Sequence, residues 1–343
     1  MRKCLQVILI QFLILGLIVT MLPASSLAGA KPIEWKFGTV YPRGVSWGNV
    51  YHSFCENVKR MSGGRLIIND IYEGEGITAT EILDSIRSGL IEMGAPYQAL
   101  HVGELPAGII ELGLPGGPTK IVELMTLFQR TAWKETLRNA YATNNTYWLG
   151  IYFQPGTYVL TKKPINSLDD FKKLKIRCPG AYGKMLRYLG ASPVVMAIAE
   201  VYTSIATGAL DGVDGCNLVD HFDGKHHEVA PYMYPLPITG AQCCPVVVNM
   251  QAFKKLPDDL QTILEQAAIV HAVDQTTWGF IWEREALQTM IKEGLKMSPK
   301  PSEEDKARWA KAGRKVWGDY EKKDKFSKEL IKIQSDFLKK IGY

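Results

Sequence analysis

The chain has 343 residues, a length that accommodates two domains more comfortably than one compact core. Hydrophobic residues make up 46% of it, and 40 basic side chains are nearly balanced by 35 acidic ones, giving a formal net charge of +5. This composition is typical of an ordinary globular protein, and so mild a charge predicts neither a nucleic-acid partner nor a membrane-surface partner.

The N-terminus has the pattern of a secretory signal peptide. Two basic residues precede an apolar run from Leu5 to Met21, and small residues follow that run. We therefore expect residues 1–30 to be removed by cleavage after Ala28 or Ala30. The alternative is an uncleaved membrane anchor, because the run approaches the length of a membrane span. The alanine-rich site favours cleavage, and hence an exported mature chain.

Five cysteines lie beyond the predicted signal peptide, and their odd number leaves at least one thiol unpaired. They are Cys55, Cys178, Cys216, Cys243 and Cys244. None has the Cys/His spacing of a common zinc motif. A disulfide between Cys178 and Cys216 is one interpretation. We favour the other, in which the thiols pack as small buried hydrophobic groups.

In the first half of the mature chain, the residue pattern predicts strands that alternate with helices, as in an α/β fold. In chain order they are a strand at Ile33–Val40, a helix at about Trp47–Met61, a strand at Leu66–Ile71, a helix at Thr80–Gly89, a helix at Ile121–Tyr141, and strands at Trp148–Tyr152 and Tyr158–Thr161. Pro106 to Pro118 is rich in glycine and proline, which predicts a loop.

The stretch from Leu174 to Asn217 predicts a β-α-β-α-β unit. Its elements are a strand at Leu174–Arg177, a helix from about Ala181, a strand at Pro193–Met196, a helix carrying Val201, Ile205 and Ala209, and a short strand ending near Asp214. Such a unit has parallel strands and right-handed crossovers, and open α/β sheets bind ligands at the carboxyl ends of strands. Arg177 and Asp214 lie at such ends, so they are the first candidate binding residues.

An internal repeat suggests how the whole chain is organised. Residues 81–92 match residues 200–211 almost position by position, and a predicted strand precedes each copy, at 65–72 and 192–198. Any amphipathic helix before a strand would give part of this match. Because glycine and serine match as well as the apolar residues, we favour a duplication. Two similar α/β lobes would then face each other across a central cleft.

The chain is expected to cross between the lobes twice, near Gln154-Pro155-Gly156 and in a strand at Val246–Asn249. Lobe 1 would comprise residues 31–155 plus about 244–270. Lobe 2 would comprise residues 156–243 plus about 271–343, including the C-terminal helices. The helices predicted in this last part are a long one at Asp258–Gly294 and two more at Asp305–Tyr320 and Phe326–Ile341.

No common catalytic motif is present: the chain lacks Gly-x-Ser-x-Gly, His-Glu-x-x-His and a phosphate loop. An exported enzyme that uses Cys178, or His221 with Asp220, is the alternative class. Adjacent residues do not readily form a base and its orienting partner, so we expect no enzyme activity. The neighbouring His226 and His227 point in different directions on a helix, and we expect exposed polar side chains there.

Several short segments of the chain belong together as one pattern: Lys163-Pro164-Ile165, Leu168-Asp169-Asp170, Leu174-Lys175-Ile176-Arg177, Leu189-Gly190-Ala191-Ser192-Pro193, Glu200-Val201-Tyr202 and Leu210-Asp211-Gly212. This pattern resembles the solute-binding proteins of TRAP (tripartite ATP-independent periplasmic) transporters, the C4-dicarboxylate-binding or DctP-like family. The resemblance implies a periplasmic, type II-like binding protein in which a long helix braces both lobes. It also implies that Arg177 pairs with a substrate carboxylate, and that small and large membrane subunits receive the ligand.

Within the family, Ala230-Pro231-Tyr232 and Asn249 are similar to the branch that binds 2-oxo and 2-hydroxy monocarboxylates. The chain departs from other members in two places. No second arginine occurs at Gly156–Leu160, where sialate- and dicarboxylate-type members often carry one. Asp214-Gly215 stands where metal-using members have Glu-Trp, and their further glutamate near Thr239–Gln242 is absent.

These features predict a small monocarboxylate ligand, since a dianion beside the single guanidinium of Arg177 would leave one buried charge unpaired. The other candidate binding residues are Tyr97, Gln98, Gln154, Tyr158, Asn217, Gln242 and Asn249. Asp214 would suit a hydroxyl group, or a Na⁺ or Ca²⁺ ion bound with the ligand, because hard cations take oxygen ligands. A cation from elsewhere, such as Arg43 or Lys225, would restore dianion binding. The alternatives are a C4-dicarboxylate ligand and a function as the ligand-binding partner of a sensor.

Overall fold

The computed structural model describes residues 31–118 and 120–342, and the chain from Glu34 onward forms one compact unit. The predicted signal peptide lies outside the described residues. No helix in the described ranges combines the length and the apolar character that crossing a membrane requires.

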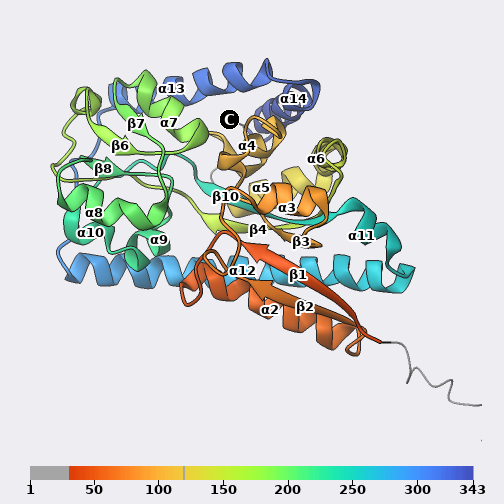
Figure 1. The fold of residues 1–343 in the computed structure, drawn as a ribbon. Coiled ribbons are helices and arrows are strands. Elements are labelled where there is room, and N and C mark those ends of the chain that lie inside the picture. Colours follow the sequence, from red (N-terminus) through yellow and green to blue (C-terminus); the bar gives the residue numbers. More distant parts are fainter. Residues whose placement is uncertain (1–30, 119, 343) are drawn as a thin grey trace, which may run out of the picture. The chain divides into compact units, whose positions relative to one another are not determined.

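The first sheet has five strands in the order β2-β1-β3-β10-β4. Their bounds are β1 Ile33–Thr39, β2 Leu66–Ile71, β3 Met93–Ala95, β4 Thr146–Pro155 and β10 Ala241–Asn249. β3 runs parallel to β1, whereas β10 is antiparallel to both β3 and β4. Helices α2 (Ser46–Met61) and α3 (Ile82–Ser88) connect the first three strands, as Figure 1 shows.

The second sheet has six strands in the order β11-β9-β5-β8-β6-β7. Their bounds are β5 Leu160–Thr161, β6 Lys175–Arg177, β7 Ser192–Val194, β8 Gly212–Val213, β9 Tyr232–Met233 and β11 Lys296–Met297. β6 lies between β7 and β8 and is parallel to both, as the β-α-β-α-β prediction requires. Helices α7 (Gly180–Tyr188) and α8 (Val201–Ala206) are its connections.

The two sheets repeat one arrangement, which confirms the predicted pair of similar α/β lobes. The order β2-β1-β3 in the first sheet corresponds to β7-β6-β8 in the second. In each case a helix joins the central strand to the outer strand, and a second helix returns to the inner one. An antiparallel strand then pairs with the third member, β10 with β3 and β5 with β8.

Strands β4 and β10 link the two sheets. They pair along their whole length, from Ala241 opposite Pro155 to Asn249 opposite Thr146. The chain leaves the first sheet after Pro155 and re-enters it at Ala241, so the two connections run side by side. Helix α12 (Asp258–Lys292) packs on α2 and β4 and also on α9 (Leu218–Asp223). Its 35 residues span about 50 Å, so one helix braces both sheets.

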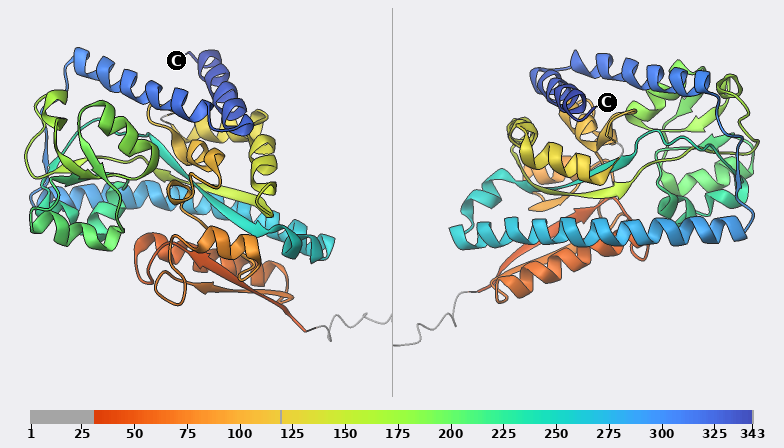
Figure 2. Two further views of the ribbon diagram at one scale, coloured as in Figure 1. Left: turned by 45° about the horizontal axis from the view of Figure 1, so that its top comes forward. Right: turned by 180° about the vertical axis from the view of Figure 1, so that it is seen from behind.

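The remaining helices cover the outside of the sheets. They are α5 Ile121–Arg130, α6 Trp133–Ala142, α10 His226–Val229, α11 Met250–Lys255, α13 Glu303–Glu321 and α14 Lys325–Lys340. α13 packs on α7, whereas α14 packs on α6 and on α4 (Pro106–Gly113). Figure 2 shows the two C-terminal helices running over both halves. The domain boundaries stay a prediction.

Two predicted elements are wrong. The expected loop at Pro106–Pro118 contains helix α4, which buries Ile109, Ile110 and Leu112. Pro106 occupies the first turn, where a missing N–H costs nothing, so proline there starts a helix and does not break one. The expected single helix at Ile121–Tyr141 is two helices, because Thr131 is extended and its hydroxyl accepts a hydrogen bond from the Trp133 N–H over 3.1 Å.

Candidate functional site

Arg177 ends strand β6, and its side chain is 7% exposed. Nε donates to the Met196 carbonyl over 3.2 Å, and Nη1 donates to the Asp214 carbonyl over 3.2 Å. Nη1 also lies 3.8 Å from Cys216 Sγ. Among the described residues these bonds hold one side of the guanidinium and leave Nη2 for another acceptor. Backbone carbonyl groups just beyond strands β7 and β8 thus hold the buried cation in place.

Asp214 follows strand β8 and is fully buried. The backbone N–H of Asp214 donates to the Arg177 carbonyl over 2.7 Å, so parallel pairing brings the two predicted residues together. Cys178 Sγ donates to Oδ2 over 3.2 Å, while Oδ1 is buried without a hydrogen-bond partner among the described residues. Burial raises the pKa of Asp214 to about 6, although the Cys178 thiol and the Arg177 charge act to lower it.

The buried hydroxyl groups without a hydrogen-bond partner in the described chain include those of Tyr97 and Thr157. Tyr97 follows β3, and its pKa is raised by burial while the charge of Arg177 lowers it, so the two side chains are close. Thr157 lies near Asp214 and acts to lower its pKa. Buried polar groups in native proteins are almost always paired, so unpaired groups around Arg177 point to a missing polar partner.

Asn217 and Gln154 are buried and belong to one hydrogen-bonded network. Asn217 accepts from Trp47 Nε1 over 3.2 Å and donates to Gln154 Oε1 over 3.4 Å. Gln154 Nε2 donates to the hydroxyl groups of Tyr41 and Tyr152, over 3.2 Å and 3.1 Å. Asn217 also caps helix α9. The network joins α2 and β4 of the first lobe to α9 of the second.

The two other glutamines are buried and bonded to their own surroundings. Gln98 Nε2 donates to the Cys243 carbonyl over 2.9 Å and to Glu111 Oε2 over 3.4 Å. Gln242 Nε2 donates to the Tyr182 hydroxyl over 3.4 Å. Gln98 thus turns its amide nitrogen toward the core of the first lobe.

Asn249 lies far from the other candidates, whereas the backbone N–H of Tyr158 donates to the Cys216 carbonyl over 3.2 Å. Burial raises the pKa of Tyr158, and its nearest charges, Glu283 and Arg284, belong to helix α12. Asn249 caps α11 through the N–H groups of residues 251 and 252 and donates to the Ile86 carbonyl over 2.8 Å. It stands at the far end of β10 from Gln242, roughly 20 Å away at about 3.3 Å per residue.

The two cations weighed as extra anion binders are used elsewhere. Arg43 pairs with Glu75, with Nε 2.7 Å from Oε1, and both side chains are exposed. Lys225 is exposed and lies 4.0 Å from Glu228. Neither enters the surroundings of Arg177.

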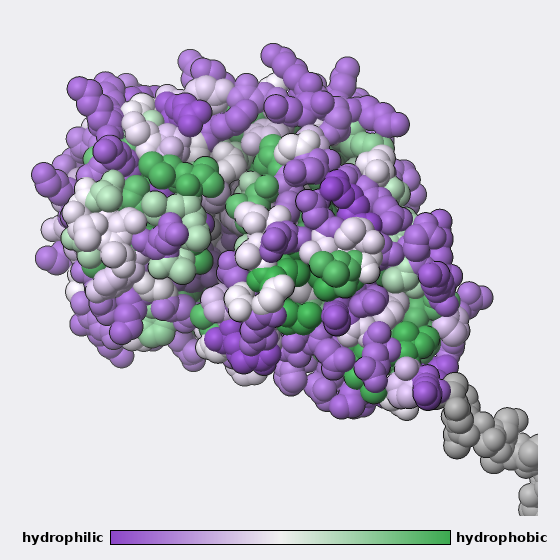
Figure 3. Space-filling view, viewed as in Figure 1, coloured by the Kyte–Doolittle hydropathy of each residue, from purple (hydrophilic) through white to green (hydrophobic). Residues whose placement is uncertain are grey.

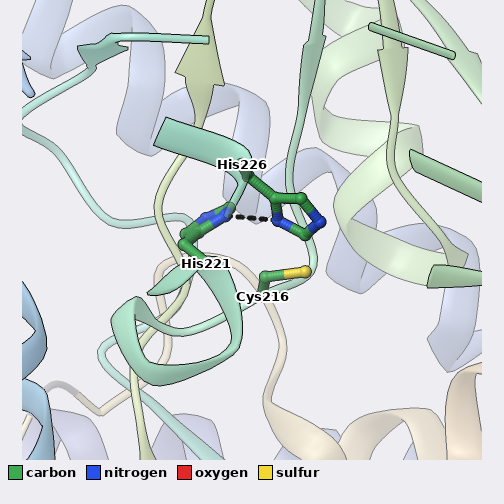
Figure 4. A group of neighbouring side chains, drawn as sticks. All are labelled: Cys216, His221 and His226. Carbon is green, nitrogen blue, oxygen red and sulfur yellow. Dashed lines mark hydrogen bonds between the residues drawn. The ribbon is translucent and has the colours of Figure 1, made fainter. Parts of the chain in front are cut away.

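The histidines correct one prediction: His226 and His227 are buried, not exposed, and His221 is buried as well. His221 and His226 face each other with their Nδ1 atoms 3.1 Å apart, and Cys216 lies beside them (Figure 4). Desolvation lowers the pKa of His221 to about 4 and that of His226 well below its usual range, so both rings are neutral. His227 pairs separately with Glu293 over 2.8 Å.

All five cysteines of the described chain are free thiols, so the disulfide between Cys178 and Cys216 does not form. Four of the five are buried, in agreement with the favoured interpretation. Sequence reasoning missed Trp47, Thr157 and the Cys216–His221–His226 group. The regular Cys-x₄-His-x₄-His spacing was the available signal, but it corresponds to no common metal motif.

A cavity of about 620 Å³ opens beside α3, where Lys36, Glu75 and Arg87 contribute to its lining. The sequence-predicted binding residues do not line it. Figure 3 shows hydrophilic side chains over most of one face, which is hollowed between the surface over α8 and that over α3.

Residues 37–324 match the family described as bacterial extracellular solute-binding protein, family 7 (DctP). A monocarboxylate 2-oxoacid-binding periplasmic protein of Nostoc sp. is 25% identical over 79% of this chain and 75% of that protein. The C4-dicarboxylate-binding periplasmic protein DctP of Rhodobacter capsulatus is 28% identical over 82% of this chain and 84% of that protein.

A solved structure from Colwellia psychrerythraea superposes with a TM-score of 0.83 at 24% identity, covering 91% of this chain and 95% of that one. It is a TRAP periplasmic solute-binding protein with bound calcium and pyruvate. At this identity the likeness concerns the fold: two lobes and a long helix.

Proposed function

The chain belongs to family 7 of the bacterial extracellular solute-binding proteins, and from that premise we propose that it binds a small 2-oxo or 2-hydroxy monocarboxylate. The main support is the buried guanidinium of Arg177, whose Nη2 makes no hydrogen bond to the described residues. Oxygen atoms of Asp214, Tyr97 and Thr157 in the same region also have no hydrogen-bond partner there. A carboxylate on Arg177 would supply the acceptor that this side of the site lacks.

Charge favours one carboxylate over two. Arg177 is the single cation that the described contacts place here, and Asp214 brings a carboxyl group of its own. Arg43 and Lys225 are engaged at the surface. A second substrate carboxylate would be buried without a counter-charge, which is costly. The 2-oxoacid-binding relative from Nostoc supports this choice over the C4-dicarboxylate alternative suggested by the Rhodobacter relative.

The 2-oxo or 2-hydroxyl oxygen of the ligand would have uncharged hydrogen-bond partners. The hydroxyl groups of Tyr97 and Thr157 can donate to a 2-oxo group or exchange hydrogen bonds with a 2-hydroxyl group. Asp214 Oδ1 can accept from a hydroxyl group. These three atoms come from the segment after β3 in the first lobe and from segments of the second, so a bound acid would touch both lobes.

A Na⁺ or Ca²⁺ ion fits the same place, because Asp214 Oδ1 is a buried carboxylate oxygen without a partner in the described chain. When bound, the ion would add positive charge next to the ligand oxygen atoms. The relative from Colwellia holds calcium together with pyruvate. Asp214 is the residue of this chain that would contribute to such a site.

The cellular role that follows is capture of the acid in the periplasm and delivery to the small and large membrane subunits of a TRAP transporter. The signal-peptide pattern of residues 1–30 supports export. The second candidate function is ligand delivery to a membrane sensor instead of a transporter. Neighbouring genes for two membrane subunits would favour transport.

A thermal-shift screen of monocarboxylates and dicarboxylates, with and without Ca²⁺ or Na⁺, tests the proposed ligand class. Pyruvate, lactate and related acids should raise the melting temperature more than succinate or malate, because ligand binding to the folded state stabilises it. Stronger stabilisation by C4-dicarboxylates than by every monocarboxylate would overturn the proposal.

A further inference from the structure

Three potential metal ligands from one short stretch of chain meet in the interior of the second lobe. Cys216, His221 and His226 each offer one ligand atom, and these atoms lie within 4.8 Å of one another (Figure 4). Their exposed fractions are 0%, 0% and 1%. We propose that they form a binding site for a Zn²⁺-like ion, a borderline metal that prefers nitrogen and sulfur ligands.

The distance between the two histidine nitrogen atoms is close to that of a tetrahedral site, and Cys216 Sγ lies within 4.8 Å of a ligand atom of each ring. Zn–N bonds of about 2.0–2.1 Å and Zn–S bonds of about 2.3 Å place tetrahedral ligand atoms about 3.3–3.6 Å apart. The two Nδ1 atoms already stand 3.1 Å apart, so they need only a small outward adjustment. Three protein ligands leave a fourth position for water or another small ligand, as in open zinc sites.

The surroundings of His221 orient its lone pair. Nε2 lies 2.9 Å from the Tyr158 carbonyl oxygen, so Nε2 carries the hydrogen and donates it. Nδ1 of the neutral ring is then a lone-pair donor that faces His226 and Cys216. Metal-binding histidines commonly donate their second ring hydrogen to a carbonyl or carboxylate in this way, which fixes the tautomer.

In the described structure the hydrogen atom between the two rings therefore belongs to His226 Nδ1. On metal binding, His226 would change tautomer and carry its hydrogen on Nε2, while Cys216 would lose its thiol proton to the solvent. The metal forms bonds to two neutral nitrogen atoms and one thiolate, and one proton is released per ion.

The local charge permits a cation despite Arg177, whose Nη1 lies 3.8 Å from Cys216 Sγ. Burial raises the pKa of the Cys216 thiol, the charge of Arg177 lowers it, and the charges of Asp220 and Asp214 raise it, so carboxyl groups also lie near the sulfur atom. A Cys216 thiolate would bring a further negative charge between the ion and the guanidinium.

This site differs from the Asp214 position in the ion that it selects. Na⁺ and Ca²⁺ take oxygen ligands, whereas imidazole and thiolate groups select ions such as Zn²⁺ and Cu⁺. The inference stands on the Cys216–His221–His226 geometry and does not depend on which organic acid the protein binds.

Metal-free protein titrated with Zn²⁺, and separately with Co²⁺ as a spectroscopic probe, tests the site. One ion should bind per chain, and the Co²⁺ form should show a thiolate-to-metal charge-transfer band with the strong visible absorption of tetrahedral cobalt. Calorimetry in buffers of different ionisation enthalpy should report release of about one proton per ion.

Cys216→Ser and His226→Gln should each weaken Zn²⁺ binding at least about tenfold and remove or shift the cobalt bands, since each deletes one of three ligands. Cys55→Ser and His52→Gln are matched controls outside the group and should bind as the wild type does. Absence of stoichiometric Zn²⁺ binding, or a wild-type cobalt spectrum without a thiolate band, would overturn the site. The wild-type spectrum decides this even when a substituted chain fails to fold.

Discussion

The indole N–H of Trp47 donates to Asn217 Oδ1 over 3.2 Å, which joins helix α2 of the first lobe to the start of α9 in the second. Near this bond, Ser46 donates through its backbone N–H to Asp223 over 3.0 Å. The two lobes therefore make direct polar contacts next to the predicted ligand site. A protein that closes around its ligand would gain these contacts on closure, and so they should contribute to affinity.

Trp47→Phe should weaken ligand binding modestly, by about 0.5–1.5 kcal/mol, because it deletes one hydrogen bond between the lobes. Calorimetric titration with the best ligand of the screen measures the change. Trp317→Phe is the matched control: its indole donates to the Pro115 carbonyl away from the site, so stability should fall without a change in affinity. Equal ligand affinities for Trp47→Phe and wild type would show that this hydrogen bond does not stabilise the closed, ligand-bound state.

Arg177→Ala should fold but lose ligand binding, at a cost of about 2–5 kcal/mol, because the substrate carboxylate loses its charged partner. Arg177→Lys should recover little of this, since an ammonium group does not replace the planar fork. Calorimetry on both variants measures the loss, and Arg43→Ala serves as the control for general charge. Unchanged affinity in Arg177→Ala would exclude Arg177 from the binding site.

Ligand binding should make the protein more compact in solution if the lobes close by bending near Pro155 and Cys244, in the paired strands β4 and β10 that link the two sheets. Small-angle scattering should give a smaller radius of gyration at saturating ligand. Identical scattering curves with and without ligand would contradict a hinged clamp.

Glu111 gives a pH prediction for stability. It is buried among the Tyr141 hydroxyl, the Trp148 indole and the Gln98 amide, all of which donate to it. Burial raises its pKa from 4.5 to about 7. A raised pKa in the folded state means that the stabilising effect of the protonated form is complete below pH 4.5 and is lost as the pH rises through 7.

The wild type should therefore lose about 3 kcal/mol of stability from this group between pH 4.5 and pH 7. Chemical denaturation of the wild type and of Glu111→Gln across that range gives the free energy of unfolding of each as a function of pH. The difference between the two slopes isolates the contribution of Glu111, because Asp214 and His221 titrate equally in both proteins. An exposed control, Glu56→Gln, should follow the wild type. Parallel slopes for Glu111→Gln and wild type would contradict the assignment.

The sequence was sufficient wherever the information is local. The β-α-β-α-β pattern placed Arg177 and Asp214 at the carboxyl ends of neighbouring parallel strands, and the structure brings them together through the bond from the Asp214 N–H to the Arg177 carbonyl. The repeat of residues 81–92 in residues 200–211 predicted two similar α/β lobes, and the structure gives their sheets a shared strand order. Strand period, turn residues and crossover handedness act over short stretches, so a single chain reveals them.

Only the tertiary structure decided which polar side chains are buried and what each one contacts. Asn249 is the expected residue type for a binding site, yet it caps α11. His221 and His226 lie five positions apart in a polar stretch, yet the fold packs their rings together beside Cys216. The physical reason is that burial and hydrogen-bond partners come from segments far apart in the chain. Periodicity shows which face a residue occupies, but not what covers that face.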